Sequence, residues 1–321
     1  MSILVFVETD NGNIKKSSHE AVVFGKEVAG KIGGSVTALA MGNVDNTELA
    51  ALGKYGASKV LHATDEKLND NVVMATATLI AAAATQEGTS SVIMARSSLV
   101  DAVAARVAIK MKASVATNVV ALPDTSNGFV VKRGVYTGKA FADVLLPGAK
   151  RIITIAKNSV AAEPVEGSAS VEVFSASFTD NDFATKRKEV QKAEGDVLLP
   201  EADRVISGGR GLKGPENWEM IEDLAKTLGA ATACSKPVSD MEWRPHHEHV
   251  GQTGIKISPT LYIAAGISGA IQHLAGVNSS KVIVVINKDA DAPFFKAADY
   301  GIVGDAFEVV PKLNEAIKKV M

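Results

Sequence analysis

Residues 250–273 read VGQTGIKISPTLYIAAGISGAIQH, and this stretch decides the fold of the second half of the chain. Two polar turns flanked by glycines, at 251–254 and 266–269, enclose one short apolar run at 261–265. An apolar run of this length bounded by glycines predicts a buried strand, and the residues that follow Ser268 predict the start of a helix. We therefore expect a strand, a tight turn and a helix in succession.

This succession has the geometry of an anion-binding site. Glycine lets the backbone approach a ligand without a Cβ in the way, and the free N–H groups of a helix's first turn carry partial positive charge. Polar side chains that could reach a heterocycle lie in the same turns, namely Gln252, Thr253, Ser268, Gln272 and His273. The stretch therefore indicates a site for a nucleotide-like cofactor.

The composition limits the class of protein. With 321 residues, 46% of them hydrophobic, the chain is long enough to build the cores of two domains. The 34 Lys and Arg residues nearly balance the 36 Asp and Glu residues, so no overall field favours nucleic acid or an anionic membrane. The apolar runs are far shorter than a membrane span. We expect no nucleic-acid partner and no direct membrane insertion.

Cysteine usage and the first residues bear on location. The one cysteine, Cys234, excludes an internal disulfide and suits a reducing compartment. Met1 leads within two residues into the apolar run at 3–7, with no basic region and no small-residue cleavage site, so no export signal is expected. A cytoplasmic protein is the simplest expectation, and a processed chain of the mitochondrial matrix would look the same.

The first half of the chain alternates apolar strands with helices, which predicts right-handed parallel crossovers and a doubly wound sheet. The expected strands are 3–7, 35–41, 59–62 and 91–95, and the expected helices are 17–32, 46–53, 72–86 and 100–111. From residue 115 helices no longer separate the expected strands. The strands expected there, at 119–122, 129–136, 139–145 and 151–156, follow one another directly. The N-terminal domain is thus an α/β domain with a mostly parallel sheet, to which we expect a meander of antiparallel strands to be added.

Residues 159–200 lose this periodicity except at 171–174 and 189–191. We interpret them as extended linker and edge-strand material, with a domain boundary near Gly195. The expected domains are therefore 1–195 and 196–321.

The second domain repeats the alternation of strands and helices, which predicts another parallel sheet. The expected strands are 203–206, 231–234, 261–265, 281–286 and 301–303, and the expected helices are 216–228, 269–274, 292–297 and 311–321, with a polar loop at 235–249. Ligands of such sheets bind beyond the carboxyl ends of the strands. The glycine-flanked polar turns fall at those ends.

Five short motifs resemble those of a known family. They are SGGRG at 207–211, VGQTG at 250–254, GISGAIQHLAG at 266–276, INKD at 286–289 and DYGIV at 299–303. In their order and spacing they resemble the alpha subunit of electron transfer flavoprotein, most densely over about residues 205–312.

The resemblance implies a soluble electron carrier rather than an enzyme with its own substrate. Its cofactor would be FAD, bound by the C-terminal domain, and the N-terminal domain would pack on a beta subunit in a heterodimer. Electrons would come from acyl-CoA dehydrogenases of fatty-acid β-oxidation and from other flavoprotein dehydrogenases. They would pass to a membrane protein, the electron transfer flavoprotein-quinone oxidoreductase.

The resemblance also implies roles for single residues. Arg210, His273 and Thr253 would tune the redox potential of the flavin, Arg210 as a planar, permanently charged group near the ring and His273 against the pyrimidine oxygen. Ser235, Asn287 and Asp305 would hold the diphosphate, ribityl and adenosine portions. The remaining cofactor-binding residues would be Val250, Gly251, Gln252, Ser268, Gly269, Ala270, Ile271, Gln272 and Ala306.

Taken without the resemblance, the residues leave other interpretations open. Gly209, Gly211 and Gly214 satisfy the glycine spacing of a dinucleotide site, although the next strand ends in Ala-Cys-Ser and offers no acidic residue for a ribose. A nicotinamide-dependent oxidoreductase and a non-redox adenine-nucleotide sensor are therefore the alternative functions. Arg210 could equally be a surface arginine, and His273 a histidine of the core.

The histidines of the 235–249 loop suggest a metal site at first sight. His246, His247 and His249 lie close together in the sequence, but no cysteine or second cluster is spaced to complete a tetrahedral site. A polar loop rich in histidine is usually solvated, so we expect no metal.

Overall fold

Two sheets organise the chain. The computed structural model describes residues 2–10, 12–136, 140–189, 199–200 and 202–320. The chain divides into two units, Met1–Val190 and Gln191–Met321. The domain boundary expected near Gly195 and the periodic residues 190–191 lie outside the described residues.

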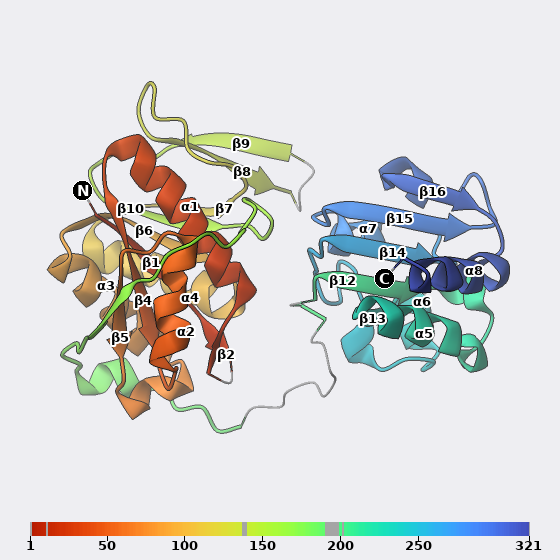
Figure 1. Cartoon of the computed structure of the whole chain (residues 1–321), viewed down its shortest axis with the longest axis horizontal. Coiled ribbons are helices and arrows are strands. Elements are labelled where there is room, and N and C mark those ends of the chain that lie inside the picture. The colour runs from red at the N-terminus through yellow and green to blue at the C-terminus, as the bar shows by residue number, and fades with distance from the viewer. Residues whose placement is uncertain (1, 11, 137–139, 190–198, 201, 321) are drawn as a thin grey trace. The chain divides into compact units, whose positions relative to one another are not determined.

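The sheet of the first unit has nine strands in the order β11-β5-β4-β1-β6-β10-β7-β8-β9 (Figure 1). Its strands are β1 (Ser2–Phe6), β4 (Ser35–Met41), β5 (Lys59–Ala63), β6 (Thr89–Ala95), β7 (Ser114–Val119), β8 (Val130–Val135), β9 (Ala140–Leu145), β10 (Arg151–Ile155) and β11 (Ser170–Val173). A small hairpin of β2 (Thr9–Asp10) and β3 (Asn13–Ile14) follows β1. The expected doubly wound α/β sheet is confirmed.

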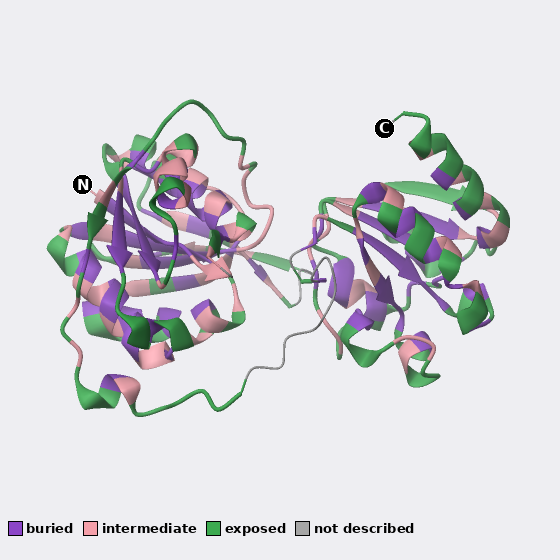
Figure 2. Ribbon diagram, turned by 60° about the horizontal axis from the view of Figure 1, so that its bottom comes forward, coloured by how far each residue is buried: buried purple, intermediate pink, exposed green. Residues whose placement is uncertain are grey.

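Helices cover both faces of this sheet because its central strands are apolar on both sides. Ile3 and Val5 of β1 pack with α1 on one face, while Leu4 and Phe6 pack with α3 and α4 on the other. Figure 2 shows the buried residues gathered on the strands and on the helix faces turned toward them. The helices are α1 (Lys16–Ile32), α2 (Asn46–Ala50), α3 (Val73–Gln86) and α4 (Ser98–Met111), with 3-10 turns η1 (Ala51–Tyr55), η2 (Glu66–Asp70) and η3 (Asp180–Phe183).

The antiparallel part of the sheet differs from the expected meander. β7, β8 and β9 do pair antiparallel, as predicted, although β7 covers 114–119 rather than the expected 119–122. The strand at 151–156 does not continue them, so that part of the prediction was wrong. β10 instead inserts between β6 and β7, parallel to both. Its residues 152–155 are all buried, which is typical of a central parallel strand rather than of an exposed edge.

Residues 159–189 lie on the first unit and include regular structure. β11 extends the sheet parallel to β5, as the periodicity at 171–174 suggested. Farther on, Asp182 in η3 accepts hydrogen bonds from the Thr78 hydroxyl of α3 at 2.6 Å and from the Thr179 amide at 2.8 Å. This segment is therefore held by specific contacts along much of its length, which the loss of periodicity did not reveal.

The second unit contains a five-stranded, wholly parallel sheet in the order β13-β12-β14-β15-β16 (Figure 1). The strands are β12 (Arg204–Gly208), β13 (Ala231–Cys234), β14 (Leu261–Ala265), β15 (Val282–Asn287) and β16 (Tyr300–Val303). One face packs with α5 (Glu219–Leu228) and α8 (Ala306–Lys318), and the other with α7 (Ile271–Val277) and η7 (Pro293–Ala297). The predicted parallel sheet is confirmed.

Several helical segments of this unit differ from expectation. The last helix begins at Ala306 rather than Pro311, because the Asp305 carboxylate caps it by accepting from the Phe307 amide at 3.0 Å. The helix expected from Gly269 begins at Ile271. The polar loop at 235–249 contains α6 (Lys236–Asp240) and η6 (His246–Glu248), and η4 (Arg210–Leu212) and η5 (Pro215–Asn217) precede α5.

The contact between η1 and the segment before β11 leads to a stability prediction. A Cβ on Gly53 would lie 2.2 Å from the Ser168 carbonyl carbon, and Ala169 N donates to Ala50 O beside it. We expect Gly53→Ala to lower the free energy of unfolding of the first unit by about 1–3 kcal/mol, because backbone must move to relieve the clash. Thermal unfolding followed by far-UV circular dichroism measures this.

Gly30 provides the matched control. It lies exposed in α1, with no atom within 4 Å of a Cβ placed on it, so Gly30→Ala should stabilise by about 0.5–1 kcal/mol. Both tryptophans, Trp218 and Trp243, belong to the second unit, so their fluorescence serves as an internal reference. If Gly53→Ala and Gly30→Ala changed the free energy of unfolding equally, the close contact of Gly53 with Ser168 would be contradicted.

Candidate functional site

The predicted site residues lie at the carboxyl ends of all five strands of the second unit. Arg210 follows β12, Ser235 follows β13, Ser268 follows β14, Asn287 ends β15 and Asp305 follows β16. Because the strands are parallel, these ends meet at one edge of the sheet. The fold thus brings together residues from five separate segments.

The glycine-rich turns at this edge contact each other through their backbones. Gly209 N donates to Ala265 O at 2.9 Å, and Gly211 N donates to Gly266 O at 3.0 Å. A Cβ on Gly209 would lie 2.2 Å from Gly266 O, and Gly266 itself has a φ of 65°, in the left-handed region. The glycines are therefore explained by turn-to-turn packing, which differs from our interpretation that they make room for a ligand.

Arg210 projects from this packed pair of turns. Its side chain is exposed, and in the part of the chain that the structure describes no hydrogen bond or ion pair engages its guanidinium. A permanently charged, planar group is thus held at the edge of the sheet by a rigid backbone and is available to a ligand.

The turn at 251–254 is held against α7. Gln252 N donates to Gln272 O at 2.7 Å, and a Cβ on Gly276 would lie 2.5 Å from Gly251 N. Val250 is buried behind the turn. The side chains of Gln252 and Thr253 are exposed, beside the start of the helix.

His273 lies inside the unit. It is 7% exposed, and its Nε2 lies 2.8 Å from the Tyr262 hydroxyl of β14. Its Nδ1 is buried, and no atom of the described residues meets strict hydrogen-bond geometry with it. Desolvation, assisted by the neighbouring His249, lowers the pKa of His273 to about 4, and the Val250 carbonyl offsets this in part. The imidazole is therefore neutral at pH 7.

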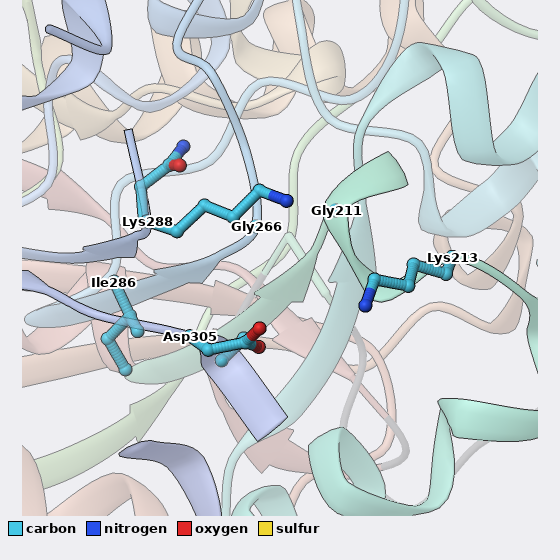
Figure 3. A pocket seen from close by; sticks show the side chains of 8 residues that line it. Gly211, Lys213, Gly266, Ile286, Lys288 and Asp305 are labelled. Carbon is cyan, nitrogen blue, oxygen red and sulfur yellow. The ribbon is translucent and has the colours of Figure 1, made fainter. Parts of the chain in front are cut away.

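A small cleft of about 40 Å³ opens between the ends of β12 and β15 (Figure 3). Lys213, Lys288 and Asp305 line it, together with Gly211, Gly266, Ile286, Asn287 and Ala306. Figure 3 shows the ammonium groups of the two lysines and the Asp305 carboxylate around a common space. Lys213 also lies over the Phe307 ring, 4.9 Å from its centroid. Two ammonium groups beside the first turn of α8 favour an anion here.

Asn287 and Asp305 also stabilise the fold through hydrogen bonds to the backbone. Asn287 Nδ2 donates to Ile267 O at 2.9 Å, and its Oδ1 accepts from the Asp289 amide at 3.0 Å. The Asn287 side chain therefore holds the turn after β14 in place. One oxygen of Asp305 caps α8, and the residue also lines the cleft.

The other predicted residues surround the start of α7, apart from Ser235. Ser235 is buried at the start of α6, where its amide donates to Gly208 O at 3.1 Å. Gly269 is buried and has a φ of 77°, and a Cβ there would lie 2.3 Å from Phe294 Cβ. The side chains of Ser268, Ala270, Ile271 and Gln272 are exposed on the turn and the first residues of the helix.

Three residues were not predicted, two at this edge and one inside the sheet. Lys213 and Lys288 line the cleft, and Tyr262 bonds His273. Lys288 directly follows the predicted Asn287 at a strand end, so the sequence carried a signal for it. Tyr262 sits within the apolar run and was interpreted only as core.

The edge fits a ligand with hydrogen-bond acceptors at one end and anionic groups at the other. The donors are the Arg210 guanidinium, which no other described residue engages, and the ammonium groups of Lys213 and Lys288. Among the described residues, no three His, Cys, Asp or Glu side chains are grouped to hold a metal ion. None of the helices in the described ranges combines the length and the apolar character that a membrane crossing requires.

Comparisons with known proteins agree with this geometry. Residues 3–181 match the family model "Electron transfer flavoprotein domain", and residues 198–278 match "Electron transfer flavoprotein FAD-binding domain". FAD is thus the cofactor of the matched domain.

Curated relatives match along the whole length. "Electron transfer flavoprotein subunit alpha" of Bacillus subtilis is 36% identical over 99% of this chain and 98% of its own. The protein of that name from Paracoccus denitrificans is 39% identical over 98% and 99%. "Protein FixB" of Clostridium saccharobutylicum is 33% identical over 99% and 97%.

These relatives support neither the nicotinamide-dependent oxidoreductase nor the adenine-nucleotide sensor. Two family models in succession, full-length relatives and a parallel sheet with the expected residues along one edge all agree. The chain belongs to the electron transfer flavoprotein alpha-subunit family.

Proposed function

We propose that the chain is the FAD-bearing alpha subunit of a heterodimeric electron carrier, with FAD along the carboxyl edge of the second unit. The observation that carries this is a set of cationic donors at that edge: the exposed Arg210 guanidinium, which has no hydrogen bond or ion pair among the described residues, and the ammonium groups of Lys213 and Lys288. When bound, FAD supplies the redox chemistry, because it takes up and releases electrons.

The protein's part is to bind the flavin and to set its potential. Arg210 would stabilise negative charge on the ring by electrostatic attraction, and His273 would do so by a hydrogen bond from a neutral imidazole. Thr253 and Gln252, exposed beside α7, would hydrogen-bond the ring edge and the ribityl chain. Each of these groups sits on a backbone that is fixed by contacts between turns.

The cleft of Lys213 and Lys288 would take the anionic half of the cofactor. The two ammonium groups and the first turn of α8 supply positive charge, and the Asp305 oxygen not facing the Phe307 amide could accept from a ribose hydroxyl. Ser235, at the end of the neighbouring strand β13, would complete the diphosphate contacts.

We also propose that residues 1–195 pack on a beta subunit. The edge strand β9 supports this, because Phe141 and Leu145 are 63% and 57% exposed and an open strand edge of this kind is suited to a partner. The electron donors would be acyl-CoA and other flavoprotein dehydrogenases, and the acceptor a membrane quinone oxidoreductase. The compartment would be a bacterial cytoplasm or a mitochondrial matrix.

An electron carrier needs no substrate pocket or nucleophile of its own. Cys234 illustrates this, because burial raises the pKa of its thiol to about 12 and keeps it protonated at neutral pH. We therefore propose that the chain transfers electrons and does not transform a substrate.

The function is tested on the chain co-purified with its beta subunit. We expect a yellow protein with the absorption of an oxidised flavin, and bleaching of that absorption when a catalytic amount of an acyl-CoA dehydrogenase and its substrate are added. A colourless complex, or a yellow one that the dehydrogenase and substrate leave unchanged, would refute the proposal.

Lys288 is expected to contribute to cofactor affinity. Removing one ammonium from the cleft should weaken FAD binding about tenfold, since a charge-assisted hydrogen bond contributes about 1.5 kcal/mol or more. Titration of the flavin-free heterodimer with FAD compares Lys288→Ala with Lys281→Ala, an exposed lysine that immediately precedes the same strand. Similar affinities for the two variants would argue against an anion in the cleft.

Arg210 is expected to raise the potential of the bound flavin. Arg210→Ala should lower the one-electron potential by about 60 mV, which corresponds to a tenfold change in equilibrium constant. Arg210→Lys should retain part of the effect because it keeps the charge and loses the planar group. Spectroelectrochemical titration measures both, and an unchanged potential in Arg210→Ala would place the guanidinium away from the ring.

A further inference from the structure

His249 differs from the other histidines of the 235–249 loop. The sequence predicted a solvated group, and His246 and His247 are exposed as expected. His249 is instead only 2% exposed, so that part of the prediction was wrong. The reason is that its backbone pairs with that of Cys234 at the end of β13, which draws the residue under the turn at 251–254.

The imidazole ring packs against both glycines of this turn. A Cβ on Gly254 would lie 2.8 Å from His249 Nδ1 and 2.9 Å from its Cε1, and a Cβ on Gly251 would lie 3.3 Å from Nε2. The backbone closes around the ring, because Ile255 N donates to His249 O at 2.8 Å and Gly254 N donates to Gly251 O at 3.2 Å. The ring therefore fills the inside of the turn, which requires glycine at position 254.

The tip of the turn has few supports of its own. Gln252 and Thr253 form the tip, and their side chains are exposed. Among the described residues no hydrogen bond or ion pair engages either side chain. One backbone hydrogen bond joins the tip to α7, from Gln252 N to Gln272 O at 2.7 Å. The position of the tip thus depends on the group that the turn encloses.

The surroundings of the ring favour its uncharged form. Burial lowers the pKa of His249, His246 and Lys236 lower it further, and Asp240 offsets this in part. The His246 ring lies 5.5 Å away, Lys236 and Asp240 of α6 pair with each other at 2.8 Å, and His273 of α7 is itself neutral at pH 7. Protonation would also place an N–H on the buried Nδ1, which has no acceptor in hydrogen-bond geometry among the described residues. A charged ring therefore opposes closure of the turn.

We propose that His249 is a positioning residue, whose uncharged ring is enclosed by the turn and holds Gln252 and Thr253 where the cofactor meets them. The role toward the flavin rests on the proposed function. The role toward the turn does not, because it follows from the contacts of this chain alone.

The direction of the pH dependence follows from the linkage between closure and protonation. The pKa of His249 is lower in the closed turn than in an open one, so opening takes up a proton below about pH 6.5, the ordinary pKa of histidine. The affinity that the closed turn contributes is therefore fully present above that pH and is lost as the pH falls.

The first experiment follows the turn itself, by amide hydrogen exchange in the flavin-free heterodimer at pH 7. His249→Ala should speed exchange over residues 251–255 about tenfold, because a cavity replaces the enclosed ring and local opening becomes easier. His247→Ala, an exposed histidine of the same 3-10 turn, should leave exchange unchanged. Unchanged exchange in His249→Ala would refute the positioning role.

The second experiment separates the shape of the ring from its charge by titration with FAD at pH 7. His249→Ala should weaken binding about tenfold, the effect of one or two misplaced hydrogen bonds to the ligand. His249→Gln keeps a polar, uncharged side chain of similar reach and should bind within about threefold of the unsubstituted complex. Equal affinities of His249→Ala and the unsubstituted complex would overturn the proposal.

The pH profile of FAD affinity is a readout that packing alone would not change. As the pH falls below about 6.5, the unsubstituted complex should lose affinity more steeply than His249→Gln, by up to about tenfold per pH unit for one proton. His247→Gln should follow the unsubstituted complex. Identical profiles for His249→Gln and the unsubstituted complex would refute the coupling. A colourless complex would refute the proposed function, while hydrogen exchange would still decide whether His249 holds the turn.

Discussion

The hydrogen bonds between the turns at the carboxyl edge of the second sheet are the constraint on which the site depends. Gly266 accepts from Gly211 through its carbonyl and donates to Ile286 through its amide, so one residue joins the ends of β12, β14 and β15. Such contact requires that no Cβ intervene, which fixes glycine at these positions. Arg210 lies between two of these glycines. Its position is therefore fixed by the backbone hydrogen bonds of its neighbours rather than by contacts of its own side chain.

A second theme is that polar groups near this edge hold the fold and, in the proposed function, would also meet the cofactor. Asn287 holds the Ile267 turn, Asp305 caps α8, and Tyr262 hydrogen-bonds His273. Groups fixed in this way lose little further freedom when a cofactor binds, so more of the binding free energy is retained. In the proposed function the same rigidity would keep donors aimed at the flavin, which is how a protein tunes a redox group.

The sequence predicted much of the fold and the candidate edge, but some elements depended on distant contacts. The apolar runs predicted the parallel strands because such strands are buried on both faces. The position of β10 was missed, since pairing partners are chosen by the whole sheet and not by adjacency in the chain. The start of α8 was missed because proline is typical of the first turn of a helix, which favoured a start at Pro311. In the structure Pro311 lies inside the helix, and Asp305 caps it.

By itself the sequence determined the fold class, the two α/β units and the motifs that place the chain in its family, because these follow from local periodicity and short patterns. The tertiary structure alone decided that the glycines serve contact between turns, that Lys213 and Lys288 share a cleft, and that Tyr262 meets His273. Those facts require residues far apart in the chain to approach within a few ångströms. No local pattern encodes such distances, because they are fixed only when strands and helices pack.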